Sequence, residues 1–252
     1  MKLKHNVSKK TLSLLIVGAS IFASSLPSFA DSYQQSLSEQ KNIEYNFKTG
    51  ITKSNYENWL AQTQSKETLD EYNSLSEQDK DLLISYLSDI NLMSLALTTN
   101  VAPNQTKTLA NGNIEIGMTE DIEVIPNDNS LDLNDFQSKA TQNRRVTYSR
   151  YIHIKGVKIL QTTSWVTYTH NGKTVTSVND RNHFTSINLN PVLRTSYSGM
   201  TKGGKGSTTA YSTADLSFTY IIEGYGPTLA SGRLRVNGTV KNVGSGSYTP
   251  YK

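Results

Sequence analysis

The spacing of apolar residues changes once along this 252-residue chain, near residue 144. Over residues 55–97 apolar side chains recur every three to four positions, which predicts short amphipathic helices. Beyond residue 144 apolar and polar residues alternate, a period of two that indicates strands with one buried face. The sequence therefore predicts an α+β fold, in which a short helical hairpin or bundle precedes a C-terminal antiparallel β-sandwich or barrel.

Helix start signals divide the helical part into three segments. Ser54 followed by Glu57 matches a capping box, Lys66 opens a second short helix, and Ser76 is expected to cap a third. The third helix carries an apolar stripe of Leu83, Tyr86, Leu87 and Ile90. We interpret this stripe as the core of a small helical hairpin, and a groove for a partner is the alternative.

Turn signals divide the alternating part into at least six strands without helices between them. The pair Asn171-Gly172, flanked by strand-like residues, predicts a type I′ hairpin turn. The most regular alternation runs over residues 209–222, and a glycine-rich turn follows it. Strands at hairpin spacing are typical of an antiparallel sandwich or barrel.

The N-terminus predicts export. Residues 1–10 are basic, a run of about 12 apolar residues follows, and small residues precede the bond between Ala30 and Asp31. The apolar run is shorter than the roughly 20 residues that span a bilayer. We expect a signal peptide over residues 1–30, cleavage after Ala30, and a released, secreted chain without a transmembrane segment. This leader and the absence of cysteine are typical of small secreted proteins of Gram-positive bacteria, and no named family is identified.

Charge is divided between two halves of the predicted mature chain. The formal net charge of +4 equals the contribution of four lysines in the predicted signal peptide, so the remainder is neutral. Residues 31–136 hold 6 basic and 18 acidic residues, and residues 137–252 hold 15 and 3. We therefore expect an acidic helical region over residues 31–99, an acidic connector with short strands over 100–142, and a basic all-β domain over 143–252.

Several classes of site are excluded or disfavoured by the residues present. The chain has no cysteine, so disulfides, cysteine-ligated zinc and thiol nucleophiles are excluded. The acidic segment at 126–135 resembles a calcium loop, but Leu133 stands where an EF-hand needs glycine. The loop at 199–206 resembles a phosphate-binding loop, but Gly206 replaces the metal-binding Ser or Thr. We expect no metal and no cofactor.

Catalytic groups are sparse in the β half. His153, His170 and His183 match no metal or triad motif, and we expect them to be solvated surface residues. Glu223 or Asp215 together with a histidine would be the sign of an exported hydrolase, which is an alternative. We nominate no catalytic residue and favour a protein without enzymatic activity.

The positive signal is a set of basic residues that we place on the outward face of the strands. These candidate binding residues are Arg144, Arg145, Arg150, Lys155, Lys158, Arg233 and Arg235. A basic sheet with many tyrosines suits an anionic partner such as a cell-wall polymer, lipid headgroups or an acidic protein. Nucleic acid is not expected as a partner of an exported protein. An alternative is a proprotein, in which the acidic half masks a cationic toxin or antimicrobial domain until cleavage near Arg144-Arg145.

Overall fold

The computed structural model describes residues 47, 49–64, 66–125, 141–221 and 226–251. These residues form four α-helices followed by nine strands, so the helices precede the strands, as the sequence predicts. The predicted signal peptide with Ala30 and Asp31, the calcium-like segment at 126–135, and Glu223 lie outside the described residues.

The helices are short and follow one another closely. They are α2 (Lys53–Thr63), α3 (Lys66–Asn73), α4 (Glu77–Ser88) and α5 (Ile90–Thr98). The capping box at α2 uses Thr52, whose side chain accepts from the Asn55 N–H while the Asn55 side chain accepts from the Thr52 N–H. The expected cap at Ser54 is therefore wrong by two residues, because Ser54 already lies within the first turn.

The cap of α4 is where the sequence predicts it, since the Ser76 hydroxyl accepts from the Asp79 N–H at 3.1 Å. The apolar stripe, however, ends at Leu87. Ile90 begins a separate helix, α5, which Asp89 caps through the Leu92 N–H, and Ile90 is 39% exposed. The chain turns at Asp89, so Ile90 does not continue the stripe of α4.

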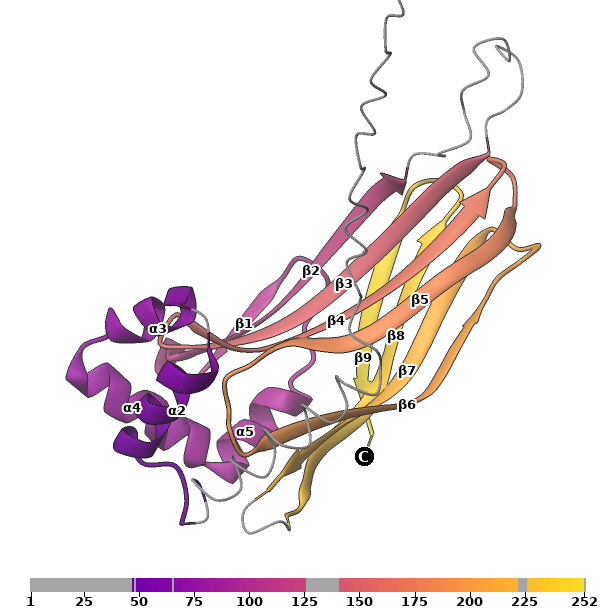
Figure 1. The fold of residues 1–252 in the computed structure, drawn as a ribbon. Coiled ribbons are helices and arrows are strands. Elements are labelled where there is room, and N and C mark those ends of the chain that lie inside the picture. Colours follow the sequence, from indigo (N-terminus) through magenta and orange to yellow (C-terminus); the bar gives the residue numbers. More distant parts are fainter. Residues whose placement is uncertain (1–46, 48, 65, 126–140, 222–225, 252) are drawn as a thin grey trace, which may run out of the picture. The chain divides into compact units, whose positions relative to one another are not determined.

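Nine strands form two antiparallel sheets (Figure 1). The five-stranded sheet contains β1 (Thr106–Leu109), β2 (Ile114–Ile125), β3 (Gln142–Ile154), β4 (Val157–His170) and β5 (Val175–Asn188). The four-stranded sheet contains β6 (Leu193–Gly203), β7 (Thr209–Tyr220), β8 (Thr228–Thr239) and β9 (Gly244–Pro250). Within each sheet the strands are in chain order, and the described strands form no closed barrel.

The segment predicted as a connector with short strands contains one long strand. Instead of remaining short, β2 runs for 12 residues and pairs with β3 over its whole length, from Ile114 opposite Ile154 to Ile125 opposite Asn143. A short 3₁₀ turn, η1 (Ala110–Gly112), joins β1 to β2. The acidic β2 thus belongs to the same sheet as the basic β3.

The type I′ turn lies at a different hairpin from the predicted one. Lys155 and Gly156 both have positive φ angles, 52° and 84°, between β3 and β4. At the predicted site Gly172 alone has a positive φ, and the Asn171 side chain accepts from the Lys173 N–H. Asparagine side chains form such local turns readily, so Asn171 does not need the left-handed conformation.

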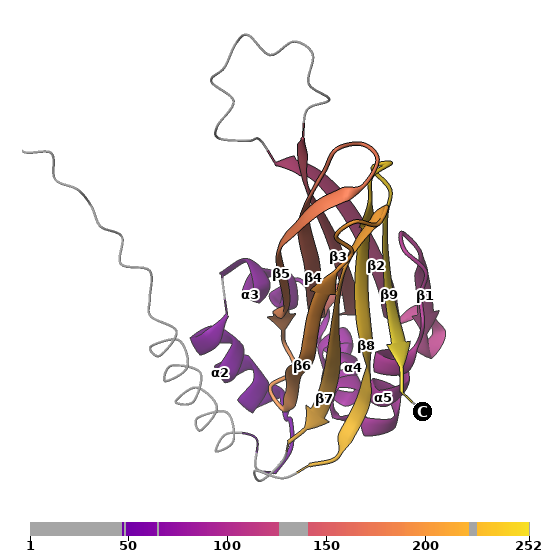
Figure 2. The ribbon, with the colours of Figure 1, turned by 90° about the vertical axis from the view of Figure 1, so that its right-hand side faces the viewer.

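The inner faces of the two sheets pack against each other, as the view in Figure 2 shows. In β7 every second residue from Ala210 to Tyr220 is buried, which confirms the alternation. The sheets approach closely at Gly246, where a Cβ atom would lie 1.7 Å from the Tyr148 ring. Helical residues such as Tyr56 and Leu87 join the same buried cluster as the strands.

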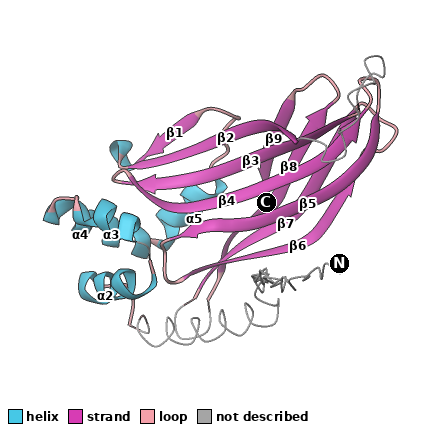
Figure 3. Ribbon diagram, turned by 45° about the horizontal axis from the view of Figure 1, so that its top comes forward, coloured by secondary structure: helices cyan, strands magenta, loops and turns pink. Residues whose placement is uncertain are grey.

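The strands have two ends of different character. At one end, the helix end, the helices contact the connections between strands (Figure 3). Hydrogen bonds that join helices to strands or their connections there include Tyr56 to Leu189 O, Ser94 to Leu229 O and Asn190 to Leu87 O. The other end, the turn end, carries the turns at residues 171–174, 204–208 and 240–243.

Candidate anion-binding surface

The structure does not gather the seven predicted binding residues on one face. In β3 the even-numbered residues point into the core and the odd-numbered ones point out. Arg144 and Arg150 are therefore 9% and 2% exposed, and neither lies on the outward face that the sequence analysis assigned to it.

Arg150 stabilises the end of a helix. One terminal nitrogen donates to the carbonyls of Ala96, Leu97 and Thr99, at 2.7, 3.1 and 3.1 Å. Carbonyls at a helix C-terminus lack partners within the helix and attract cations, so a buried guanidinium satisfies them. The guanidinium also lies 5.1 Å from the centre of the Tyr248 ring. Burial lowers the pKa of Arg150 to about 10, which leaves it charged at neutral pH.

Arg144 and Arg145 lie within β3, which pairs with β2 on one side and β4 on the other. Arg144 donates to the Gln142 side chain at 2.6 Å. Arg145 points outward, 3.5 Å from the Glu123 carboxylate and 5.0 Å from the centre of the Trp165 ring. The dibasic pair is thus part of the five-stranded sheet.

Lys155 in the β3–β4 turn and Lys158 at the start of β4 lie near acids of the helices. Lys155 forms an ion pair with Asp79 of α4 at 2.6 Å. This pair lowers the pKa of Asp79, and the Ser76 hydroxyl contributes to the same shift. Lys158 lies 5.9 Å from the centre of the Tyr151 ring and lines a hollow that also includes Glu67 and Glu71.

The last two predicted residues lie on the outer face of β8. Arg233 forms a two-pronged ion pair with Asp215, at 2.9 and 3.3 Å. Arg235 lies 4.6 Å from the centre of the Tyr211 ring, donates to Asn237, and forms no ion pair with a described residue. Arg235 is therefore an exposed cation that the described part of the chain leaves without an acid.

The turn end adds three lysines that the sequence analysis did not select. Lys173, Lys205 and Lys241 are exposed, and none forms an ion pair with another described residue. Backbone hydrogen bonds join their turns. The Val175 N–H donates to Ser207 O and the Gly206 N–H donates to Val175 O, both at 2.8 Å, and the Val240 N–H donates to Thr208 O at 3.1 Å. In a sheet of consecutive hairpins alternate turns share one end, so strand order could have predicted this grouping. We call Lys173, Lys205, Lys241 and Arg235 the cationic end.

Two histidines are buried, against the expectation that all three are solvated. His183 is 3% exposed and lies between the hydroxyls of Ser164 at 2.9 Å and Ser212 at 2.6 Å. Burial, with a smaller effect of Arg181, lowers the pKa of His183 to about 4. His170 is 2% exposed, and burial lowers its pKa as well. The two hydroxyls beside His183 join strands of both sheets, so this group has a structural role in the core.

His153 is the partly exposed histidine of the three. Its Nδ1 lies 3.3 Å from the Glu115 carboxylate on the neighbouring strand. Asp215, an acid considered for a hydrolase, is engaged with Arg233 and with the Tyr251 hydroxyl. Among the described residues, the contact between a histidine and an acid is therefore that of His153 with Glu115, and Asp215 contacts no histidine.

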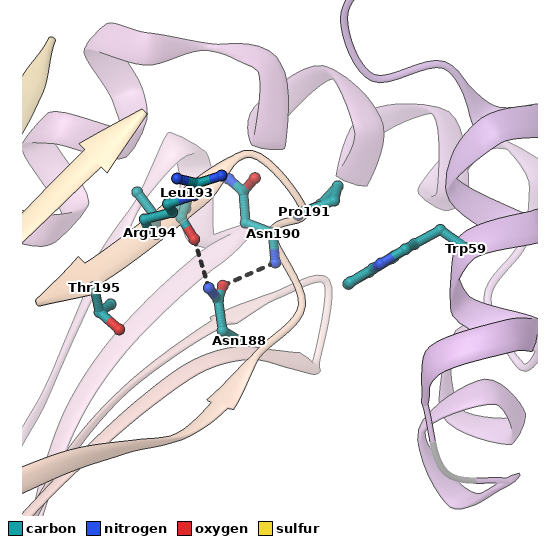
Figure 4. A pocket seen from close by; sticks show the side chains of 7 residues that line it. All are labelled: Trp59, Asn188, Asn190, Pro191, Leu193, Arg194 and Thr195. Atoms are coloured by element: carbon teal, nitrogen blue, oxygen red, sulfur yellow. Dashed lines mark hydrogen bonds between the residues drawn. The ribbon is translucent and has the colours of Figure 1, made fainter. Parts of the chain in front are cut away.

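A hollow of about 240 Å³ lies between α2 and the connection from β5 to β6. Trp59 reaches into this region from α2, opposite Asn188 and Asn190 (Figure 4). Arg194 and Thr195, at the start of β6, line the same hollow. It lies at the helix end of the strands and contains none of the seven predicted residues.

Comparison with known proteins identifies no relative: no family model, no curated protein and no solved structure matches the chain. The residues that the structure describes contain no cluster of histidines and acids suited to a metal ion. No helix within the described ranges has both the length and the apolar character to cross a membrane.

Proposed function

We propose that this chain is an exported, non-enzymatic binding protein whose cationic end binds an anionic polymer of the cell wall. One observation carries this proposal. The bases of the cationic end form no ion pair with described residues, whereas Arg145, Lys155 and Arg233 each have an acidic partner. Charges that have no partner within a protein are available to attract one of opposite sign.

The chemistry of this surface suits an extended polymer. Lys173, Lys205 and Lys241 lie on three separate turns, and Arg235 is on an adjoining strand, so the charges are distributed over a surface. The Tyr211 ring beneath Arg235 adds an aromatic face. Phosphate or carboxylate groups spaced along a polymer could contact several of these cations at once. Several weak contacts together raise the affinity of the protein for the polymer.

Export rests on the N-terminal sequence. The basic residues, the apolar run and the small residues before Asp31 form the three regions of a secretory signal. Export would bring the cationic end into contact with wall polymers.

The two alternatives have less support. A proprotein cut at Arg144-Arg145 would need a protease to reach a strand that is paired on both sides. Such a cut would also place α5 and Arg150 on different fragments of the chain. In the fold, however, Arg150 donates to a carbonyl of α5. A hydrolase would need an acid close to a histidine. Among the described residues of the basic strands, His153 is the histidine that contacts an acid, Glu115.

Binding can be tested with purified Gram-positive cell walls, before and after extraction of their phosphate polymers. We expect the chain to sediment with untreated walls and to lose most of this retention after extraction. Raising the salt concentration from about 0.1 M to 1 M shortens the Debye length from about 10 to 3 Å, so retention should fall. Retention that is absent, or that survives both treatments, would contradict the proposal.

A matched pair of variants locates the surface. The variant K173Q/K205Q/K241Q should reduce retention at least tenfold. The control K66Q/K107Q/K158Q removes the same charge elsewhere on the chain and should change retention by less than about twofold, because binding is local. Equal losses in the two variants would show that net charge alone matters. Mass spectrometry of culture supernatant tests export, with a first residue of Asp31 expected.

A further inference from the structure

A hollow with apolar walls lies beside Lys241, within the cationic end. Its volume is about 350 Å³, which falls in the roughly 300–1,000 Å³ range of pockets that bind small ligands. The residues that line it include one base and no acid; they are Thr208, Thr239, Val240, Lys241 and Val243. The hollow therefore combines one positive charge with walls built mainly from valine side chains and threonine methyl groups.

The β8–β9 turn that forms one wall is held by its own hydrogen bonds. The Thr239 hydroxyl accepts from the N–H groups of Lys241 at 3.3 Å and Val243 at 3.1 Å. The Thr239 N–H donates to Val243 O at 2.9 Å. Asn242 has a positive φ angle of 61°, which asparagine adopts more readily than most residues. The wall is therefore preformed, and a ligand would not have to order it.

Two valines leave apolar surface exposed in this wall. Val243 is 57% exposed, the largest fraction among the large apolar side chains that the structure describes. Val240, which lines the same hollow, is only partly buried. One exposed valine is ordinary on a protein surface. Two valines that line one hollow, however, provide area that an apolar group of a ligand can cover and remove from water.

Two polar groups of the hollow have no partner among the described residues. The Lys241 ammonium forms no ion pair with a described acid. The Thr208 side chain is exposed and forms no hydrogen bond with a described residue. Both groups can donate to the oxygens of one anion. Lys173 and Lys205, on turns that backbone hydrogen bonds join to this one, add positive charge. Charge complementarity therefore favours an anionic group, and the valines favour an apolar group next to it.

We propose that this hollow binds a short apolar substituent that the wall polymer carries next to its anionic groups. Lys241 and the Thr208 hydroxyl bind the anionic group, and Val240 and Val243 contact the apolar substituent. This inference rests on the proposed function, because the same cationic end binds the polymer. It adds a chemical requirement, since a polymer that carries negative charge alone would contact only the lysines and bind more weakly.

Alkyl phosphates test the hollow in the ¹⁵N-labelled mature chain, beginning at Asp31, at constant ionic strength. Ethyl phosphate and butyl phosphate differ by two methylenes, and butanol is the uncharged control. Burial of one methylene raises affinity about fourfold, so full burial of both would give about sixteenfold. We expect the amide signals of residues 240–243 to move and saturate, with butyl phosphate binding at least fourfold more tightly than ethyl phosphate. A smaller ratio, no saturation by butyl phosphate, or butanol binding as tightly as butyl phosphate would overturn the proposal.

Two valines with nearly equal exposure provide a matched pair of variants. Val243→Ser removes the apolar contact and should reduce the ratio of butyl to ethyl phosphate affinity to less than about twofold. Val124→Ser changes a residue of β2 that is 56% exposed, and should keep a ratio of at least fourfold. On untreated cell walls Val243→Ser should reduce retention at least fourfold, and Val124→Ser by less than about twofold. Dispersed amide spectra verify that both variants are folded.

The two kinds of measurement separate this inference from the proposed function. Equal wall retention of the wild type and Val243→Ser would overturn the inference and leave the proposed function in place. No wall retention of the wild type would contradict the proposed function, and with it the wall polymer as the ligand. Vesicles of an anionic phospholipid test another occupant. If Val243→Ser releases the chain from vesicles but not from walls, the occupant is a lipid and the proposal is wrong.

Discussion

Basic residues at the two ends of the strands differ in whether they have partners within the fold. At the helix end Lys155 meets Asp79, and Arg150 meets three carbonyls of α5. At the turn end Lys173, Lys205 and Lys241 meet no described acid. Both ends belong to one antiparallel fold, so the difference comes from what covers them: helices contact the first end, and exposed lysines occupy the turns of the second.

This difference shows that the acidic and basic halves of the sequence do not form two separate functional units. Acids of β2 and α4 pair with bases of the next strands, as in Glu123 with Arg145 and Asp79 with Lys155. Lys173, Lys205 and Lys241, which form no such pair with a described residue, lie on the turns at the other end of the strands. Substitutions at the helix end should therefore reduce stability, and substitutions at the turn end should reduce binding.

The largest expected effect belongs to Arg150→Met at the helix end. This change leaves three buried carbonyls without their donor and should lower the free energy of unfolding by about 3 kcal/mol. Urea unfolding followed by circular dichroism measures the loss. Arg235→Met, which removes an exposed cation, is the control. A loss below about 1 kcal/mol for Arg150→Met would mean that water replaces the guanidinium.

The next effect concerns the core between the two ends, where His183 links hydroxyls of both sheets. Its pKa is about 4 in the folded chain and near 6.5 when exposed. Between these pH values the unfolded chain binds the extra proton, so stability falls as the pH drops from 6.5 to 4, by at most about 3 kcal/mol.

Urea unfolding at several pH values between 4 and 7 measures this dependence. Carboxylates also titrate in this range, so the informative quantity is the difference between the wild type and His183→Gln. The variant should show a shallower decrease. Parallel curves for the two proteins would assign the acid sensitivity to other groups.

A smaller effect is expected for Lys155→Gln. The ion pair with Asp79 joins the β3–β4 turn to α4, and partly exposed pairs contribute little to stability. The urea midpoint should decrease slightly, by less than in Arg150→Met. The double variant with Asp79→Asn should add little further loss, because the two residues act as one pair. Additive losses would argue against a direct pairing.

The smallest effect on stability is expected at the turn end. In the variant K173Q/K205Q/K241Q the free energy of unfolding should change by less than about 0.5 kcal/mol, as is usual for exposed side chains without partners. Thermal unfolding gives the measurement. A clear gain in stability would show that the lysines repel one another, and a clear loss would show that they have partners in the fold.

Several elements could be predicted because their signals are local. The helix cap at Ser76, the alternation in β7 and the order of helices before strands all follow from neighbouring residues. The alternation in β3 also indicates that Arg150 is buried, because it lies on the same face of the strand as Val146 and Ile152. Its burial could have been read from the sequence, whereas its partners in α5 could not.

The candidate sites depended on longer-range information. Nothing near Lys205 in the chain indicates that Lys173 and Lys241 lie at the same end. Strand order within each sheet and backbone hydrogen bonds between the two sheets bring their turns together. The hollow beside Trp59 likewise joins α2 to the β5–β6 connection, about 130 residues away, through the Tyr56 bond to Leu189 O. Pairing of this kind depends on the three-dimensional fold.

Residue periodicity, capping groups and composition decided the class of elements in this chain, because each depends on side chains a few positions apart. Tertiary structure decided which charges are satisfied and which stay exposed, because ion pairs and buried hydrogen bonds join residues distant in sequence. Arg150 and Arg235 illustrate this division, because both are basic residues in strands. Arg150 is buried in the core, and Arg235 is exposed on the surface.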